Sequence, residues 1–586
     1  MTTSDQLPDD ARRRQGAFFT PRLWAAEAHK SLDKVLGVGW RDECIVWDPA
    51  AGTANLTRDY RFDDLIISTA EKPDVRVIEE QGYNAGASVF QYDFLNPGFA
   101  SPFFDTGDKN LIPDSVHKQL KAAAKAGRRL VFLMNPPYGT AKGGSTKEGA
   151  HKAGIAKTLV NEQMKKAKLG SPSQQLYAQF MYQCCTLAQR YGFKAHTVAL
   201  FSPSKFMCSG SYRNFRLWWY GRYEVKDAFM FQASHFADVN GSWGISHTIW
   251  NSPGKTNLSA PVPCTLKDEP KGTFAVTDIG PKALYNSDNR EASKWVREPI
   301  KGRKGVDAPQ SSSGLKVKGK GRGSISQGAM GYMQSNGNSI QYNTQFVALY
   351  PSAFSGANGF SVRGTTGGNF RRAIALYGAR KLVKDHWTIH EDEYLVPHAE
   401  GTPVYEQWIN DCHVYAILHN SNNCTAMRNV AYKDGPPNGS KDWQIHNHFF
   451  WLDHADALAA LDTTDTPALY RDCKQHPSKD VFGNPVVSTP DPYMAHALRY
   501  KVDLSNEAKA VLDKLQALWL LSLPHRENYA AGKPELHLTA WDASVYQLKF
   551  LWRDLFPTEW ADLQVAFKIL SAKIRPGVYE HGFLLK

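Results

Sequence analysis

The sequence of 586 residues lacks the features that would place it in a membrane or in an oxidising compartment. No run approaches the roughly 18 apolar residues that a membrane span requires, and the polar start MTTSDQLPDDARRR lacks the apolar stretch of a signal peptide. The eight cysteines are scattered without a repeated C-x-x-C, which argues against a disulfide framework and against a zinc ribbon. The composition therefore predicts a globular protein of the cytoplasm with no membrane anchor.

The sequence does have an excess of positive charge. It contains 69 Lys and Arg against 57 Asp and Glu, a net charge of +12. Such an excess is compatible with a polyanionic partner such as nucleic acid. The length predicts about three domains, each with its own core. We place their boundaries at residues 1–255, 256–500 and 501–586.

Residues 20–250 alternate short β-branched runs with helical patterns, which predicts an α/β fold with a doubly wound, Rossmann-like sheet. Thr20 is expected to cap a first helix with Pro21 at its first position, and Gly37 to end it. The last two strands are expected to form a hairpin that closes the sheet edge. The expected strands are Cys44–Trp47, Leu65–Ser68, Ser88–Tyr92, Leu130–Met134, Thr197–Phe201, Val225–Phe231 and Gly244–Trp250.

The remainder of the chain has a less regular pattern. Residues 251–275 are rich in Pro, Gly, Ser and Lys and predict a linker. Residues 301–324 are basic, with almost no large apolar side chain, and predict a flexible, irregular segment. Residues 325–500 are mixed and predict an α+β region, whereas 504–523 and 541–573 have the apolar stripes of helices.

Polar or glycine-containing sets follow four of the predicted strands. In an open α/β sheet the ligand lies outside the carboxyl ends of the strands, so these sets mark a candidate site. Gly52 allows a tight turn, Glu71 can accept the hydroxyls of a ribose, and Asp93 offers a carboxylate beside the ring of Phe94. The sets are Asp48-Pro49-Ala50-Ala51-Gly52-Thr53-Ala54-Asn55, Glu71, Asp93-Phe94 and Asn135-Pro136-Pro137-Tyr138.

Three of these sets also have a purely structural interpretation. Asp48-Pro49 is a common way to open a turn, Glu71 fits a solvated loop, and Asp93-Phe94 fits a strand end. The fourth set is harder to explain by turn chemistry. Two prolines fix the backbone directly after a buried strand, and a turn alone needs no aromatic residue. Asn135 and Tyr138 are therefore expected to project from a stiff loop, which favours a functional role.

The order of these motifs resembles that of the N6-adenine DNA methyltransferases, which use S-adenosylmethionine (SAM). The resemblance covers about the first 250 residues, and it implies the seven-stranded sheet of that family. Gly16 to Pro21 resembles the N-terminal cofactor motif of the gamma-ordered class, and Ala54 stands where many relatives have a second glycine. The cofactor contacts that the resemblance implies are Phe18, Phe19, Thr20, Pro21, Asp48, Pro49, Ala50, Gly52, Asn55, Glu71, Asp93, Phe94 and Asn135.

The resemblance also implies the reaction. Asn135 to Tyr138 match the catalytic tetrapeptide. The exocyclic amine of adenine is a poor nucleophile because its lone pair is delocalised, so the Asn135 side-chain oxygen and the Pro136 carbonyl would accept its hydrogens. Tyr138 would stack on the base flipped out of the duplex. Ser202 to Phe206 and Phe236 to Trp243 resemble later motifs that line the target-base pocket.

Basic residues outside these motifs are candidates for contacts with DNA phosphates. Some lie in the lysine-rich loop after Tyr138 and in the basic segment 301–324, and others lie in a second group that is interleaved with aromatic residues. The candidates are Lys142, Lys205, Arg303, Lys304, Lys318, Lys320, Arg322, Arg371 and Arg372.

No metal site is predicted from the sequence. Cys412, His413, His419 and Cys424 match no zinc-finger spacing. The run from His446 to Trp451 fits an aromatic packing cluster better than a metal site.

The sequence thus predicts a stand-alone, SAM-dependent adenine-N6 methyltransferase of double-stranded DNA, belonging to a restriction-modification, anti-phage defence or phage-protection system. Residues 1–255 would be catalytic, 256–500 would recognise DNA, and 501–586 would form a helical region. A restriction or defence component, where one exists, would be a separate chain. The alternatives are methylation of cytosine N4, of an RNA base or of a protein glutamine, and a modification subunit that binds DNA without turnover.

Overall fold

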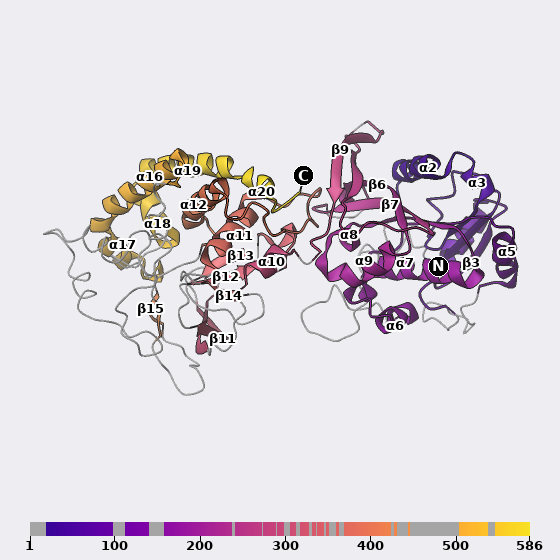
Figure 1. Ribbon diagram of the computed structural model, residues 1–586, viewed down its shortest axis with the longest axis horizontal. Coiled ribbons are helices and arrows are strands. Elements are labelled where there is room, and N and C mark those ends of the chain that lie inside the picture. The colour runs from indigo at the N-terminus through magenta and orange to yellow at the C-terminus, as the bar shows by residue number, and fades with distance from the viewer. Residues whose placement is uncertain are drawn as a thin grey trace. The chain divides into compact units, whose positions relative to one another are not determined.

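In the computed structural model the chain forms two compact units (Figure 1). Unit 1 comprises residues 1–289, 385–393 and 586, and unit 2 comprises residues 290–384 and 394–585. The structure describes residues 19–97, 112–139, 158–236, 241–271, 273–288, 290–297, 305–311, 317–326, 331–335, 337–344, 347–350, 359–362, 369–422, 427–430, 443–445, 503–536 and 545–585.

Unit 1 is built on a nine-stranded sheet with the order β3-β2-β1-β4-β5-β7-β6-β8-β9. The strands from β3 to β5 in this order are parallel, and β7 runs antiparallel to both β5 and β6. The strands are β1 (Ile45–Asp48), β2 (Leu65–Thr69), β3 (Ser88–Gln91), β4 (Leu130–Met134), β5 (His196–Pro203), β6 (Glu224–Gln232), β7 (Gly244–Ser252), β8 (Val262–Asp268) and β9 (Thr277–Leu284).

Helices cover both faces of this sheet, so its central strands are apolar throughout rather than alternating. All residues of β1, β2 and β4 are buried. Side chains of α5 and α7 pack on one face, and Trp24, Ala28 and Leu32 of α2 pack on the other. The helices are α2 (Arg22–Leu36), α3 (Trp40–Glu43), α4 (Lys72–Glu80), α5 (Asp114–Lys125), α6 (Leu159–Lys166), α7 (Leu176–Tyr191), α8 (Lys205–Cys208) and α9 (Arg213–Tyr220). Short 3-10 helices cover Ser171–Gln174, Gly210–Tyr212 and Ala233–His235.

This architecture confirms the predicted α/β fold and all seven predicted strands of the sheet. The last two of them, β6 and β7, form the predicted antiparallel pair. The prediction that this pair closes the sheet edge is wrong, because β8 and β9 extend the sheet beyond β6. The linker predicted for residues 251–275 is wrong, because Val262–Asp268 forms β8 and pairs with β6. The sheet therefore continues to Leu284 of β9, beyond the predicted domain boundary at residue 255.

Unit 2 combines small antiparallel sheets with helices. Its strands are β10 (Gly305–Ser311), β11 (Val317–Ser326), β12 (Gly331–Ser335), β13 (Val347–Tyr350), β14 (Gly359–Val362), β15 (Met427–Val430) and β16 (Trp443–Ile445). Its helices are α10 (Ala292–Trp295), α11 (Phe370–Leu382), α12 (Pro403–Leu418), α16 (Asn506–Ser522), α17 (Arg526–Gly532), α18 (Val545–Leu555), α19 (Pro557–Ile574) and α20 (Gly577–Glu580). Short 3-10 helices cover Ile340–Tyr342, Leu523–His525 and Pro534–Leu536.

Two sequence predictions for unit 2 are refined. The basic segment 301–324 was predicted to be irregular, but it contains most of the antiparallel pair β10 and β11. The helical pattern of 541–573 is divided into α18 and α19, which begins with Pro557, a residue that favours the first turn of a helix. The helix predicted at 504–523 is α16.

Residues Asp385–Glu393, here called the return segment, belong to unit 1 although unit 2 flanks them on both sides in the sequence. Asp392 accepts a hydrogen bond from Lys282 of β9 at 2.7 Å, and both side chains are buried. The Glu393 carboxylate accepts hydrogen bonds from the Gly210 backbone at 2.9 Å and from the Ser287 hydroxyl at 2.7 Å. The ring of Trp387 lies in the core of unit 1. The return segment is thus an integral part of this unit.

Among the described residues, no helix is both long and apolar enough to cross a membrane. The same part of the chain holds no cluster of three or more His, Cys, Asp or Glu side chains that could bind a metal ion. Cys412 and His413 lie in α12, and Cys424 and residues 446–451 are outside the described residues.

Candidate functional site

The sequence-predicted site residues follow β1, β2, β3 and β4, which are parallel neighbours in the sheet. Their carboxyl ends therefore share one edge. β1 lies between β2 and β4, so the strand order reverses at this point. Such a reversal opens a crevice at the carboxyl edge, where α/β sheets bind ligands. The structure thus brings Asp48, Glu71, Asp93 and Asn135 to one edge of the sheet.

The tetrapeptide after β4 is held by a chain of side-chain hydrogen bonds. The Tyr138 hydroxyl donates to the Asn135 side-chain oxygen at 2.6 Å. The Asn135 amide nitrogen in turn donates to the Thr20 hydroxyl at 3.0 Å. Thr20 is buried, whereas Asn135 and Tyr138 are half-buried. Two segments that lie 115 residues apart in the sequence are thereby joined at the site.

Thr20 does not have the role predicted for it. The N-cap of α2 is Pro21, and no side chain caps the helix. Gly37 does end α2, as predicted. The threonine hydroxyl is used instead as the acceptor for Asn135, which fixes the plane of that amide. This tertiary contact explains why a helix-capping pattern was misleading here.

The ring of Trp243, the residue before β7, packs against the ring of Tyr138. The two ring centroids are 6.0 Å apart and the rings are nearly perpendicular, at 83°. Burial raises the pKa of the Tyr138 hydroxyl well above its usual value, so the hydroxyl remains protonated and can donate. Trp243 belongs to a stretch that the sequence placed near the target pocket, and Ala237 to Asn240 of that stretch are outside the described residues.

Asp48 at the end of β1 is fully buried and incompletely paired. One carboxylate oxygen accepts a hydrogen bond from the Ala50 backbone at 3.2 Å. The other oxygen, Oδ2, has no hydrogen-bond partner among the described residues. Burial raises the pKa of Asp48 to about 8. A buried carboxylate with a free oxygen is costly, and a cationic ligand placed beside it would remove that cost.

The turn after Asp48 requires unusual backbone angles. Gly52 has φ +51° and Ala54 has φ +63°, both in the left-handed region. Glycine adopts this region freely, whereas a methyl side chain is strained there. Ala54 is the position at which many of the resembling proteins have glycine, and the structure supplies the reason for that preference. Pro49 is buried, and Ala50 and Asn55 are half-buried in the same turn.

Glu71 and Asp93 lie farther along the same edge. Glu71 is the N-cap residue of α4, and burial, followed by the charge of Asp74, raises its pKa. The Asp93 carboxylate accepts hydrogen bonds from the Leu95 backbone at 3.1 Å and from the Asn96 side chain at 2.8 Å. Phe94 is only 2% exposed. Its ring stacks on Phe180 at 5.0 Å in the core, so a cofactor ring would meet little of its surface.

Sequence reasoning missed one polar residue at this edge. Asn96 connects the Asp93 carboxylate to the Leu159 backbone of α6. An Asn three residues after Asp93 was the only signal, and asparagine is common in turns of any kind.

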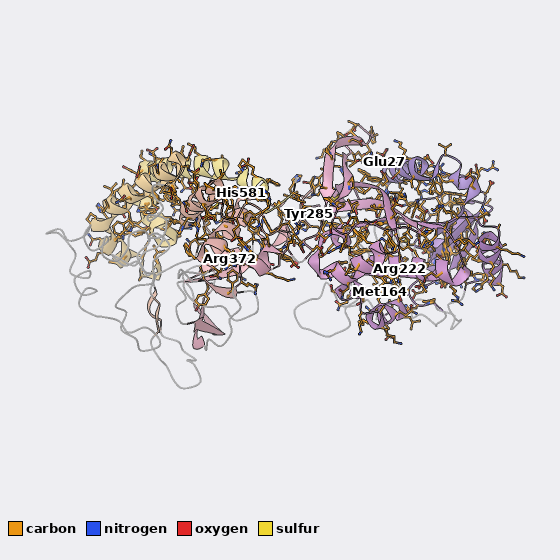
Figure 2. All side chains as sticks on the ribbon, in the orientation of Figure 1. Glu27, Met164, Arg222, Tyr285, Arg372 and His581 are labelled. Carbon is orange, nitrogen blue, oxygen red and sulfur yellow. The ribbon has the colours of Figure 1, made fainter. Side chains whose placement is uncertain are left out.

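The candidate DNA contacts are only partly described. Lys205 is half-buried at the start of α8, and Lys318, Lys320 and Arg322 lie in β11. In unit 2, Arg371 bonds to Asn410 at 3.1 Å and forms an ion pair with Glu406, and Arg372 (Figure 2) donates to the Trp295 carbonyl at 3.1 Å. Both arginines are thus engaged within unit 2. Phe18, Lys142, Arg303 and Lys304 are outside the described residues.

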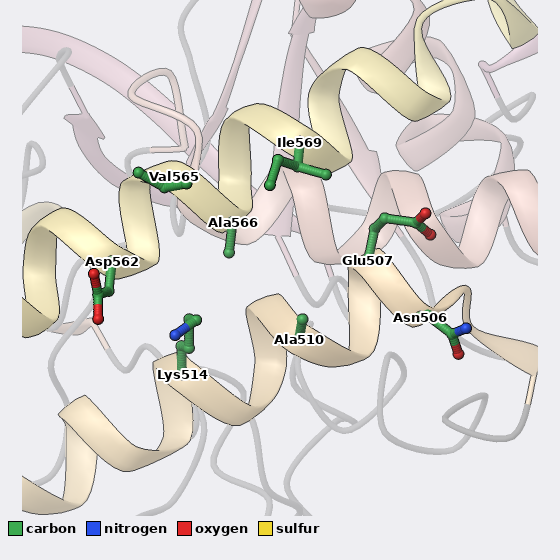
Figure 3. Close-up of a pocket in the computed structure, with 8 residues that line it drawn as sticks. All are labelled: Asn506, Glu507, Ala510, Lys514, Asp562, Val565, Ala566 and Ile569. Carbon is green, nitrogen blue, oxygen red and sulfur yellow. The ribbon is translucent and has the colours of Figure 1, made fainter.

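A separate hollow of about 400 Å³ lies between α16 and α19 in unit 2 (Figure 3). Val565 and Ile569 of α19 line it and are each more than half exposed. Three charged side chains, Glu507, Lys514 and Asp562, also line it. None of the sequence-predicted site residues does.

Comparison with known proteins gives only distant structural likenesses. No protein-family model matches the sequence, and no curated protein matches it. Similar solved structures include DrdV in complex with DNA, with 14% identity and a TM-score of 0.31 over 48% of this chain and 29% of that chain. A type I restriction-modification methyltransferase subunit from Streptococcus thermophilus has 14% identity and a TM-score of 0.27, over 44% of this chain and 50% of that one.

A third similar structure is the ATP-dependent Type ISP restriction-modification enzyme LlaBIII bound to DNA. It has 10% identity and a TM-score of 0.35, over 69% of this chain and 40% of that chain. The chain therefore spans half or less of the length of each of these three proteins.

Proposed function

We propose that this protein is a SAM-dependent DNA methyltransferase that modifies the N6 amine of adenine. The observation that carries the proposal is the arrangement at the carboxyl edge of the sheet. There Thr20 fixes the amide of Asn135, and the amide oxygen accepts a hydrogen bond from Tyr138. Asn135 follows β4, and the neighbouring strand β1 ends in Asp48, whose Oδ2 has no partner among the described residues. The motif order supports SAM as the methyl donor and adenine as the target.

The residues present fit a cationic cofactor. The free Oδ2 of Asp48 suits a positively charged group, and the left-handed turn at Gly52 permits close approach of the backbone to a ligand. Glu71 and Asp93 supply further carboxylate acceptors along the same edge. When bound, SAM would supply an electrophilic methyl group on a sulfonium. The proposed cofactor contacts are completed by Phe18, Phe19, Pro21, Pro49, Ala50 and Asn55, whereas the buried ring of Phe94 is no longer among them.

The protein side of the mechanism follows from the Asn135 contacts. Its side-chain oxygen would accept one hydrogen of the target amine, and the Pro136 carbonyl would accept the other. Drawing these hydrogens out of the plane of the base would reduce the conjugation of the nitrogen lone pair with the ring and direct the lone pair toward the methyl donor. Thr20 keeps the amide in the required orientation, because it occupies the Asn135 nitrogen and leaves the oxygen toward Tyr138.

The bond from Tyr138 to Asn135 gives the tyrosine two separable roles. The hydroxyl occupies an acceptor that the base amine needs, whereas the ring can stack on the flipped base. Tyr138→Phe should therefore keep turnover within about threefold of the unmodified protein. Tyr138→Ala should lose about 1 to 3 kcal/mol of base stacking, which weakens kcat/KM by roughly 5- to 150-fold. Steady-state kinetics on a methylatable duplex separates the two outcomes.

The deciding experiment incubates the protein with labelled SAM and mixed genomic DNA, followed by nucleoside mass spectrometry. We expect N6-methyladenine from the unmodified protein and at least 100-fold less from Asn135→Ala, since removing one positioned hydrogen-bonding group costs roughly 10²- to 10³-fold. Asn214→Ala is the matched control, because Asn214 is an exposed residue whose amide donates to the Lys168 carbonyl at 3.2 Å. Its activity should be unchanged.

Other products would redirect the assignment. N4-methylcytosine, label in RNA, or label in protein glutamine would each overturn the adenine proposal and identify the true substrate. SAM binding without transfer to any of them would indicate a modification subunit that has lost turnover. Strands β8 and β9 belong to the sheet of unit 1, so residues 262–284 are not part of the proposed recognition region. The recognition role of the rest of 256–500, the helical role of 501–586 and a separate restriction or defence component depend on the first result.

A further inference from the structure

The return segment does more than complete the core of unit 1, because it also contacts the first residue of β7. A Cβ atom built on Gly244 would lie 3.1 Å from the carbonyl oxygen of Trp387 and 3.0 Å from Sδ of Met230. Both distances are shorter than most contacts of real Cβ atoms. The absence of a side chain at Gly244 is therefore what lets the backbone of Trp387 approach the start of β7 this closely.

Gly244 directly follows Trp243, whose ring packs against Tyr138 at a centroid distance of 6.0 Å. The Trp243 carbonyl accepts the Ala233 N–H at 3.0 Å, which ties its backbone to the end of β6. The backbone of Trp243 is thus held by β6 through this hydrogen bond and by the return segment through Gly244. A displacement of the return segment would therefore reach the ring of Tyr138 through a single intervening side chain.

The return segment itself is firmly fixed. The buried Asp392 accepts a hydrogen bond from Lys282 at 2.7 Å, and Glu393 accepts one from Ser287 at 2.7 Å. The ring of Trp387 packs in the core of unit 1. Because a close-packed interior resists small displacements, a methyl group added to Gly244 should move the start of β7 rather than the return segment.

The same segment also reaches the second stretch that resembles a target-pocket motif, Ser202–Phe206. Glu393 accepts the backbone N–H of Gly210, four residues after this stretch, at 2.9 Å. Pro203 within the stretch pairs with Ile245 of β7, so the two stretches meet at the same edge of the sheet. Both of them are thus followed closely by a contact with the return segment.

We propose that the return segment positions Trp243, and through it Tyr138, for engagement of the target base. The proposal rests on the proposed function, in which the ring of Tyr138 stacks on the flipped base. Trp387 and Gly244 are positioning residues in this role, since they act through the aromatic pair and not on the base. A misplacement of about 1 Å can lower a rate about 100-fold, so a shift of a few tenths of an ångström should lower it about fivefold.

Two variants separate the return segment from its neighbour on β6. Gly244→Ala places a methyl group against the Trp387 carbonyl and against Sδ and Cγ of Met230. Gly244→Ala in a Met230→Ala background removes both Met230 atoms, so the Trp387 carbonyl is the crowding atom that remains of these three. Gly86→Ala is the matched control, because Gly86 is exposed and a Cβ atom there would meet nothing within 4 Å.

The test measures kcat/KM for mixed genomic DNA with labelled SAM on the full chain, together with SAM affinity and binding stoichiometry by calorimetry. We expect kcat/KM to fall about fivefold in Gly244→Ala relative to the unmodified protein, and by a similar factor in the double variant relative to Met230→Ala. SAM affinity and stoichiometry should be unchanged, and Gly86→Ala should match the unmodified protein. A loss of folded protein would instead lower the SAM stoichiometry in proportion to the activity.

The possible failures are distinguishable. An unmodified protein that binds SAM but produces no N6-methyladenine would overturn the proposed function. An active protein whose double variant equals Met230→Ala would overturn only the role of the return segment, because the crowding would then come from Met230. Activity that falls only in step with SAM stoichiometry would likewise reduce the contact to a structural one. If Gly244→Ala fails to fold, the less crowded double variant decides the matter.

Discussion

Among the charged side chains that the described residues bury completely, Asp48 of unit 1 and Arg380 of unit 2 are paired very differently. Asp48 in unit 1 accepts one backbone hydrogen bond and has a free oxygen. Arg380 in unit 2 is also 0% exposed, but its guanidinium donates four hydrogen bonds of 2.8 to 3.2 Å. The acceptors are Asn343, Ser335, Gly337 and Ser339.

The difference separates a structural charge from the proposed cofactor contact. Burial shifts both groups toward the neutral form: the pKa of Asp48 is raised to about 8 and that of Arg380 is lowered to about 10. Arg380 stays charged at neutral pH and holds Ser335 at the end of β12, and Gly337, Ser339 and Asn343 after it, in place. The Asp48 carboxyl, by contrast, accepts one hydrogen bond, from the Ala50 backbone, and so contributes little to holding the chain around it. A buried charge whose partners are complete stabilises the fold, whereas one that lacks a partner indicates where a ligand belongs.

The largest effect on stability is expected from removing the four hydrogen bonds that the Arg380 guanidinium donates. Arg380→Met should lower the free energy of unfolding by at least about 3 kcal/mol, because several buried acceptors lose their donor at once. SAM affinity, measured on the folded fraction, should stay within twofold. Urea denaturation together with calorimetry checks both quantities. A loss below 1 kcal/mol would mean that the guanidinium is not a structural centre of unit 2.

Removal of the unpaired charge should act in the opposite direction on stability. Asp48→Asn should raise the free energy of unfolding at pH 7 by about 1 to 3 kcal/mol, because folding no longer has to protonate a carboxyl whose pKa burial raises to about 8. It should also weaken SAM binding at least tenfold. Asp59→Asn, in an exposed part of the same loop region, is the control and should change neither. Equal SAM affinity in Asp48→Asn would remove Asp48 from the cofactor site.

The pH dependence of binding offers a sharper version of the same contrast. The folded pKa of Asp48 is about 8, well above the unfolded value of 3.8, so this group stabilises the fold fully below about pH 4 and loses that contribution as pH rises toward 8. A cationic ligand favours the ionised form. SAM affinity should therefore increase up to about 50-fold between pH 6 and 8, with release of nearly one proton at pH 7. Calorimetry in two buffers of different ionisation enthalpy measures this release, which should vanish in Asp48→Asn.

The smallest effect concerns the turn around Asp48. Ala54→Gly relieves a left-handed strain of about 1 to 2 kcal/mol, but it removes a buried methyl worth about 0.8 kcal/mol and makes the unfolded chain more flexible. Stability should change by less than about 1 kcal/mol, and SAM affinity by less than threefold. Thermal unfolding and calorimetry test this expectation. A large gain in affinity would show that Ala54, and not Asp48, limits cofactor binding.

Much of unit 1 was predictable because its signals are local and strong. The apolar run of β4, followed by two prolines, gave the strand with its observed bounds and the tetrapeptide after it. What could not be predicted depends on distant contacts. Thr20 has the local pattern of a helix cap, but its hydroxyl accepts a hydrogen bond from Asn135, which is 115 residues away. The bond of Asn96 to Leu159 likewise has no local signal in the sequence.

Composition misled in two further places. Residues 251–275 have the Pro, Gly and Ser content of a linker, but β8 lies near the sheet edge, where only some of its residues are buried. The short run Val262–Asp268 therefore carries little apolar pattern. The basic segment has many glycines, yet β10 and β11 pair along it, since backbone hydrogen bonds in a ladder do not depend on apolar side chains.

The return segment gives unit 1 a discontinuous sequence. Trp387, Asp392 and Glu393 complete its core and its ion pairs, yet they are encoded within the stretch that otherwise builds unit 2. A genetic exchange with a single crossover after residue 289 would therefore combine the sheet of one protein with the return segment of another. A new second unit can be inherited only if these nine positions, 385–393, are retained, or if their hydrogen-bond donors Lys282, Ser287 and Gly210 change with them. Diversification of this protein by module shuffling is constrained accordingly, and gradual change within unit 2 is the less restricted route.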